Sequence, residues 1–304
     1  MFLNLCKMAE QLLFKSMSVL KCPNVFMKNS TEVEKKLLAF IQGGVNQLQI
    51  ITDFDETITK QKPLSGKSVL TSIGVLHACP SLPDSYKIQS KALYDKYHPY
   101  ECDHKLDKTI KTNIMLKWWE EESEILKNIF LPQQEFEDVA QNSYDKLRDN
   151  TFEMLNYAKE HKIPVLIFSA GVGNSIIAIL KVNRLMLKNI TIVSNFLKYK
   201  TGDIIDGFQN PLIHILNKND YILKNSNHYQ QVYEEKPNIL LLGDAIGDAE
   251  MAADKPKQTV LRIGFIKGND KRTIELFSNE FDILLIDDQS MNVPLELLKL
   301  IPKK

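Results

Sequence analysis

Two pairs of aspartates follow apolar runs in this sequence, and carboxylates at this spacing suit metal chemistry. Asp53 and Asp55 come after an apolar run that begins at Leu48, and Asp244 and Asp248 come after a second one in Asn-Ile-Leu-Leu-Leu-Gly-Asp-Ala-Ile-Gly-Asp. Crowded carboxylates repel one another unless a cation offsets their charge. Because Mg²⁺ takes carboxylate oxygens and also accepts phosphate oxygens, the two pairs predict one magnesium site.

A hydroxyl, a glycine-rich turn and a lysine lie between the two acid pairs in the sequence. A third apolar run begins at Pro164 and ends in Ser169-Ala-Gly-Val-Gly, ahead of a helical pattern. Backbone N–H groups in such a turn, with a helix start behind them, suit a phosphate oxygen. Lys218 follows His-Ile-Leu-Asn and offers a point charge for phosphate. These residues predict that the magnesium site handles a phosphate group.

A parallel sheet is the scaffold that brings such distant residues together. Residues 31–60 and 151–304 alternate helical and extended patterns, which predicts an α/β core with a Rossmann-like parallel sheet and helices on both faces. Ligands bind such sheets in the crevice at the carboxyl ends of the strands, where the acidic residues are expected to lie. The runs 196–199 and 204–208 flank Thr-Gly-Asp and predict a hairpin.

Residues 61–150 differ from the core in that their patterns are helical and highly charged. Apolar residues recur at three- and four-residue spacing over 84–97, 106–129 and 133–150. We therefore expect an α-helical cap inserted between the first two motifs. Residues 1–30 are rich in lysine, and we expect an N-terminal extension that forms a docking helix or a loose terminus.

Composition excludes several classes of protein. The 304-residue chain has 44% hydrophobic residues and zero formal net charge, so it can bury a full core and has no basic field for a nucleic acid polymer. No apolar run reaches the roughly 18 residues that a membrane span needs. The cysteines lack metal-ligand spacing and indicate free thiols in a reducing compartment: Cys6, Cys22, Cys79 and Cys102. We expect a cytoplasmic monomer that acts on a small ligand.

In this order, the motifs resemble those of the haloacid dehalogenase superfamily, and most closely the cytosolic 5′-nucleotidase III family. The similar segments are Asp53-Phe-Asp-Glu-Thr-Ile-Thr, Phe168-Ser-Ala-Gly-Val-Gly, Val193-Ser-Asn-Phe, Gly207-Phe-Gln-Asn-Pro-Leu-Ile-His214, Asn217-Lys218 and Leu242-Gly-Asp-Ala-Ile-Gly-Asp. The resemblance covers residues 31–301. It implies a magnesium-dependent 5′-nucleotidase that converts nucleoside 5′-monophosphates into nucleoside and phosphate.

The resemblance also implies a role for each residue of the site. Asp53 is expected to attack phosphorus and form an aspartyl-phosphate, and Asp55 to act as general acid and base. The metal is expected to bind Asp53, the backbone carbonyl of Asp55 and Asp244 directly. Asp248 is expected to bind it through water or to hydrogen-bond one of its ligands. The phosphoryl oxygens are expected to contact three further groups: Ser169, the Ala170 N–H and Lys218.

The base is expected to bind in the cap. Glu101, in Tyr-His-Pro-Tyr-Glu, resembles the family glutamate that hydrogen-bonds the base, and Trp118 and Trp119 match the family in spacing. A ring that faces the site could stack on the base, and we expect at least one of the two tryptophans to pack in the helix core. Glu122 departs from the family pattern, in which this residue is small, and so does segment 60–68. Pyrimidine nucleotides and 7-methylguanosine monophosphate both stay candidate substrates.

Two other functions share parts of this pattern. A phosphatase of the same fold could act on a non-nucleotide phosphomonoester, although Glu101 and the tryptophans favour a nucleotide. A phospho-accepting signalling module also uses aspartates, a hydroxyl and a lysine around Mg²⁺. Such a module is shorter and lacks an inserted cap, and Asp55 argues against it because an acid/base beside the nucleophile hastens hydrolysis.

Overall fold

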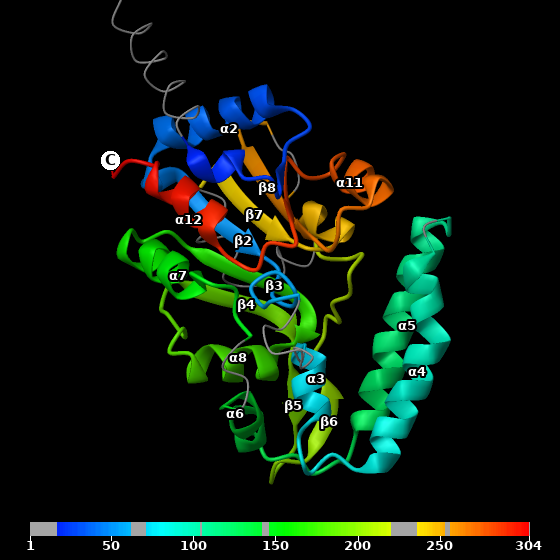
Figure 1. Ribbon diagram of the computed structural model, residues 1–304. Helices are drawn as coiled ribbons and strands as arrows, with labels where there is room; N and C mark the ends of the chain where they lie inside the picture. Colours follow the sequence, from blue (N-terminus) through cyan, green and yellow to red (C-terminus); the bar gives the residue numbers. More distant parts are fainter. Residues whose placement is uncertain are drawn as a thin grey trace, which may run out of the picture.

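We describe a computed structural model of the chain, shown in Figure 1. The structure describes residues 17–61, 71–103, 105–141, 146–219, 236–252 and 256–303. Most of the expected N-terminal extension and of segment 60–68 therefore lies outside the described residues.

Strands and helices alternate along the core. The strands are β1 (Val25–Phe26), β2 (Leu48–Thr52), β3 (Val165–Val172), β4 (Ile190–Asn195), β5 (Leu197–Tyr199), β6 (Ile205–Phe208), β7 (Asn238–Gly243), β8 (Thr259–Ile266) and β9 (Ile283–Ile286). The α-helices are α2 (Ser30–Gly43), α3 (Ser72–His77), α4 (Asp84–Cys102), α5 (Lys108–Leu126), α6 (Gln134–Gln141), α7 (Thr151–Glu160), α8 (Gly173–Val182), α11 (Lys271–Phe277) and α12 (Asn292–Lys299). Short 3₁₀ helices cover Ser18–Lys21, Val45–Gln47 and Ile246–Met251.

The main sheet has seven strands in the order β1-β9-β8-β7-β2-β3-β4. All neighbours pair in parallel except β1, which runs antiparallel to β9. The expected Rossmann-like α/β class is thus confirmed. β2 lies between β7 and β3, so Asp53 and Asp244, which follow β2 and β7, and Ser169, in the last part of β3, meet at one edge of the sheet.

Both faces of the sheet are buried, as parallel sheets require. Neighbouring residues of a strand point to opposite faces, and Ile50 and Ile51 of β2 belong to two different hydrophobic clusters. Leu240 and Leu241 of β7 divide in the same way. The first cluster includes Phe40 of α2. Because both of its faces are packed, the sheet holds the residues at its edge in fixed positions.

A helical region lies between β2 and β3 in the sequence. In Figure 1 the long helices α4 and α5 run side by side as a pair that stands away from the sheet, and the short α3 contacts α8, β3 and α6. The hairpin confirms the extended runs expected there, since β5 pairs antiparallel with β6. The Ser123 hydroxyl of α5 accepts the Phe208 N–H at 2.8 Å, which ties the helix pair to the hairpin.

Two expectations need correction. The helix expected over 133–150 ends at Gln141, and Leu147 instead bridges Thr59 in an antiparallel contact. The Arg148 N–H donates to the Ile58 carbonyl at 3.0 Å, so pairing between the two chain segments replaces the helix there. In the expected N-terminal extension, residues 25–26 form the edge strand β1 rather than a helix or a loose terminus.

None of the helices in the described residues is both long enough and apolar enough to span a bilayer.

Candidate active site

Three aspartates form a buried acidic cluster at the carboxyl edge of the sheet. Asp53 follows β2, and its backbone N–H donates to the Leu242 carbonyl of β7 at 3.0 Å, which extends the sheet pairing by one residue. Asp53, Asp244 and Asp248 each offer a carboxylate oxygen, and these oxygens all lie within 4.8 Å of one another. The structure thus brings together residues that lie up to 195 positions apart in the sequence.

Lys218 lies at the centre of this cluster. Its Nζ is 2.6 Å from Asp53 Oδ1 and 2.5 Å from Asp248 Oδ1, and the lysine is buried. The other oxygen of Asp248 accepts the backbone N–H groups of Asp244 at 3.1 Å and Ala245 at 2.9 Å. Asp248 is therefore held by three donors and is oriented by the loop that carries Asp244.

The electrostatics of the cluster reflect its burial. Burial raises the pKa of Asp53 to about 7, Lys218 opposes this rise and the charge of Asp248 adds to it. Burial and the charges of Asp53 and Asp248 raise the pKa of Asp244 well above its ordinary value. Burial alone would lower the pKa of Lys218, but the charges of Asp248 and Asp53 raise it. The cluster holds more negative charge than one lysine offsets, and its oxygen donors suit a hard divalent cation such as Mg²⁺.

Ser72 holds both side-chain oxygens of Asp55. Its backbone N–H donates to Asp55 Oδ1 at 2.7 Å and its hydroxyl donates to Oδ2 at 2.5 Å, while the same hydroxyl accepts the Val172 N–H at 3.1 Å. Burial raises the pKa of Asp55 and the hydrogen bonds from Ser72 lower it. A Cβ at Gly171 would overlap the Ser72 hydroxyl and lie 2.8 Å from Asp55 Oδ2, so the Asp55–Ser72 pair requires glycine there.

The last part of β3, residues 169–172, is held by Asn195. The sequence predicts a turn from Ser169 onward, whereas the structure continues the strand to Val172 with a shift of register. The side-chain amide of Asn195 donates to the carbonyls of Ala170 at 2.8 Å and Ile213 at 2.7 Å, and its Oδ1 accepts the Ile213 N–H at 2.8 Å. Ser169 is buried, and its hydroxyl accepts the Gly171 N–H at 3.1 Å. Asn195 thus links the last part of β3 to the segment that leads from Ile213 to Lys218.

Arg148 supports the loop that carries Asp53 and Asp55. This arginine is 1% exposed and donates to the backbone carbonyls of Glu56 at 2.5 Å, Thr57 at 2.7 Å and Asp288. The Thr57 hydroxyl in turn donates to Asp244 Oδ1 at 3.0 Å. The loop is therefore fastened on one side by Arg148 and connected to the acidic cluster on the other.

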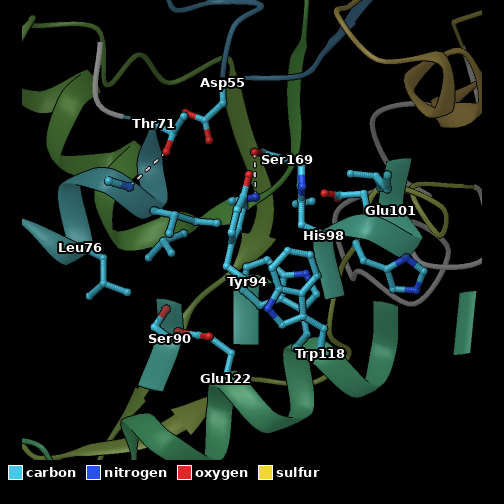
Figure 2. A pocket seen from close by; sticks show the side chains of 18 of the residues that line it. Asp55, Thr71, Leu76, Ser90, Tyr94, His98, Glu101, Trp118, Glu122 and Ser169 are labelled. Carbon is cyan, nitrogen blue, oxygen red and sulfur yellow. Dashed lines mark hydrogen bonds between the residues drawn. The ribbon is translucent and has the colours of Figure 1, made fainter. Parts of the chain in front are cut away.

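A cavity of about 830 Å³ joins the acidic cluster to the helix pair. Asp53, Asp55, Ser169, Ala170, Lys218 and Asp244 line one part of it, and Glu101, Trp118, Trp119 and Glu122 line another. Figure 2 shows side chains from this cavity, with Asp55 and Ser169 in one region and Trp118 and Glu122 in another. Of the residues predicted from the sequence, Asp248 alone does not line the cavity; it lies behind Asp53 and Lys218 in the acidic cluster.

Aromatic rings form the wall of the cavity on the helix pair. The ring of Trp118 is stacked on Tyr97 with centroids 5.9 Å apart and meets Tyr94 edge-on at 6.0 Å. Trp119 meets Phe208 edge-on at 5.4 Å and packs against the hydrophobic core, in line with the expectation for one of the two tryptophans. Burial raises the pKa of Glu101, against the opposing charges of His98 and Lys111.

Sequence reasoning did not single out Ser72, Arg148 or Asn195. Asn195 lies in the segment Val-Ser-Asn-Phe that carried part of the resemblance, which is a signal that could have found it. Nothing near Ser72 or Arg148 marks them, because their importance comes from contacts with residues far away in the sequence.

The family model for pyrimidine 5′-nucleotidase (UMPH-1) matches residues 56–302. The chain belongs to this family. It is therefore an enzyme of the 5′-nucleotidase class, and the resemblance found in the sequence is confirmed.

Individual relatives agree with this assignment. The 7-methylguanosine phosphate-specific 5′-nucleotidase of Drosophila melanogaster is 38% identical over 279 residues, which are 91% of this chain and 87% of the relative. The human protein of the same name is 31% identical over 288 residues, which are 94% of this chain and 95% of the relative. Both similarities extend over nearly the whole chain.

Solved structures support the fold. The crystal structure of cytosolic 5′-nucleotidase IIIB bound to cytidine has a TM-score of 0.91 and 37% identity, and the match covers 95% of this chain and 97% of that one. A haloacid dehalogenase family hydrolase from Salmonella enterica has a TM-score of 0.51 at 15% identity, with coverage of 85% and 73%. The second similarity concerns the fold alone.

Proposed function

We propose that this enzyme is a magnesium-dependent nucleotidase that hydrolyses 7-methylguanosine 5′-monophosphate, and also CMP and UMP, through an aspartyl-phosphate at Asp53. The observation that carries the proposal is one cavity that joins the acidic cluster to a wall of Trp118 and Glu101. A phosphate can bind at the acidic cluster and a base at the wall that holds Trp118 and Glu101. The names of the relatives favour the methylated purine, and the name of the family model favours the pyrimidines.

The acidic cluster fits Mg²⁺ by its oxygen donors and by its excess of negative charge. Asp53, Asp244, the backbone carbonyl of Asp55 and, through water, Asp248 would hold the ion. When bound, Mg²⁺ offsets the negative charge of the carboxylates and of the phosphate group.

The residues of the site support a reaction in two steps. A carboxylate oxygen of Asp53 forms a bond to phosphorus while the bond from phosphorus to the 5′-oxygen breaks, and the carboxyl group of Asp55 gives its proton to the departing oxygen. Asp55 then takes a proton from water, the water oxygen bonds to phosphorus, and the bond to Asp53 breaks. Phosphate and nucleoside are released, and both aspartates return to their starting forms.

Three groups are placed to stabilise the phosphoryl oxygens. Ser169 and the Ala170 N–H lie in the last part of β3, which Asn195 holds, and Lys218 lies next to Asp53. Donors fixed in place before the reaction stabilise developing charge more than mobile donors do. The burial of Lys218 also keeps the nucleophile and its counter-charge in contact in a region of low dielectric constant.

Phosphate release tests this proposal. We expect Mg²⁺-dependent release from 7-methylguanosine, cytidine and uridine monophosphates, little release from adenosine monophosphate or phosphoserine, and loss of all release when EDTA removes the metal. Full activity in EDTA would exclude the metal-dependent mechanism. Release from phosphoserine alone would retain the fold and the reaction but exclude base recognition by the cavity.

A further inference from the structure

Glu122 is a carboxylate in the cavity that the reaction described above does not use. It lies on α5 one turn after Trp118, so both side chains project from the same side of the helix. Its contacts are with the first part of α4, whereas Glu101 lies near the end of α4 and is influenced by the charge of Lys111. Figure 2 shows the rings of Tyr94 and Trp118 between Glu101 and Glu122. The two carboxylates therefore border the aromatic wall at opposite ends.

A small polar cluster holds Glu122 in place. The Tyr86 hydroxyl donates to Glu122 Oε1 at 2.7 Å. Burial raises the pKa of Glu122, and the Tyr86 and Ser90 side chains oppose this rise. His77 Nε2 lies 3.4 Å from the Tyr86 hydroxyl and 3.3 Å from the Ser90 hydroxyl. A carboxylate offers about four lone-pair positions, and the Tyr86 hydroxyl uses one of them. Glu122 is thus oriented by its neighbours and keeps acceptor capacity for a ligand.

The charge of Glu122 is not offset by a nearby cation. Within the described segments, no lysine or arginine forms an ion pair with it. Burial, together with the charge of Lys87, lowers the pKa of His77, which disfavours a positive charge on that imidazole. Lys91, which also lines the cavity, is paired with Asp95. Glu122 is half-buried, and a half-buried carboxylate without a counter-charge is unfavourable, so a positively charged ligand would stabilise it.

We propose that Glu122 is a specificity-determining residue that selects nucleotides with a positively charged base. The inference rests on the proposed function and names the substrate class of that site. A flat cation gains attraction from the aromatic faces and from the carboxylates Glu101 and Glu122 at the same time. 7-Methylguanine carries a positive charge, whereas guanine, cytosine and uracil are neutral. The carbonyl edge of uracil would also meet a carboxylate with repulsion.

The variant Glu122→Gln tests this, because glutamine keeps the size of the side chain and removes its charge. We expect kcat/KM for 7-methylguanosine monophosphate to fall about 10- to 100-fold, as for the loss of a hydrogen bond or contact to a charged group. The values for guanosine and cytidine monophosphates should stay nearly unchanged. The selectivity ratio of methylated to unmethylated guanosine monophosphate should therefore collapse.

Matched variants separate charge selection from a structural role. Glu124→Gln alters an exposed glutamate of the same helix, which pairs with Lys127 and does not line the cavity, and should leave the ratio unchanged. Tyr86→Phe removes one donor to Glu122 and should lower the ratio less than Glu122→Gln does. Hydrolysis of 4-nitrophenyl phosphate and the thermal midpoint should both be retained in Glu122→Gln, because the change removes a half-buried charge.

Equal losses by Glu122→Gln on methylated and unmethylated nucleotides, or an unchanged ratio, would overturn the inference. A wild-type enzyme that releases phosphate from no nucleotide would instead refute the proposed function. In that case the inference is still decided by binding, because the chain has only two tryptophans, Trp118 and Trp119, and both line the cavity. Their fluorescence should be quenched by 7-methylguanosine at lower concentration than by guanosine, and Glu122→Gln should remove that difference. Identical titrations for the two nucleosides in the wild-type protein would overturn it.

Discussion

Asp53→Asn is expected to lower kcat on nucleotides on the order of 10⁴-fold or more, the scale seen when a covalent nucleophile is removed. The amide has the size of the carboxylate but lacks the charge needed to attack phosphorus. Lys218, whose Nζ contacts Asp53 in the wild type, would still pair with Asp248, so the site should keep its shape. Phosphate release measured over hours at saturating substrate checks the result.

The same variant should fold as well as the wild type. The acidic cluster is crowded and Asp53 contributes to the raised pKa of Asp244, so the loss of one charge relieves repulsion. We expect an unchanged or higher thermal midpoint in the absence of Mg²⁺. Retention of more than a small fraction of wild-type kcat in a well-folded Asp53→Asn protein would exclude the covalent mechanism.

Lys218→Met is expected to damage both catalysis and stability. The lysine is buried between Asp53 and Asp248, and methionine keeps much of its volume without its charge. The loss of one fixed donor to the phosphoryl group lowers kcat about 10²- to 10³-fold. Removal of one partner from a buried ion pair typically costs about 3–5 kcal/mol of folding free energy.

Denaturant unfolding without Mg²⁺ and steady-state kinetics with it measure the two effects separately. Lys218→Arg is the matched control, because it keeps the positive charge and should retain more of the stability than of the activity, since the larger guanidinium displaces the bridging geometry. A Lys218→Met protein with wild-type kcat and stability would show that the lysine is only a neighbour of the site.

The elements that position the acidic cluster could be predicted because each one carries its own local signal. An apolar run that opens into Asp53, Ser169 or Asp244 marks a strand end, and alternation with helices implies that the strands are parallel. Since strand ends in one parallel sheet meet at one edge, the assembly of these residues followed from the pattern alone. The order of the strands in the sheet had no such local signal.

Contacts between distant segments account for what could not be predicted. The side chain of Ser72 matters because it reaches Asp55, and that of Arg148 because three backbone carbonyls surround it. Periodicity also misled at residues 147–149, where pairing with the segment around Thr59 overrides a helical pattern. Local propensity is a weak signal when a partner segment offers competing hydrogen bonds.

The departure of Glu122 from the family pattern was visible in the sequence, but its meaning was not. A carboxylate on a helix is most often a solvated side chain, as Glu124 of the same helix is. The structure distinguishes the two, because Glu122 faces the cavity and accepts the Tyr86 hydroxyl.

Trapping of the covalent intermediate tests the central claim most directly. The enzyme would be quenched in acid during turnover of 7-methylguanosine monophosphate labelled in its phosphate group, and the protein then digested and mapped. We predict a hydroxylamine-labile label on the peptide that contains Asp53, and none in Asp53→Asn. Steady turnover with no labelled peptide at any quench time, or a label on a peptide without Asp53, would contradict the account.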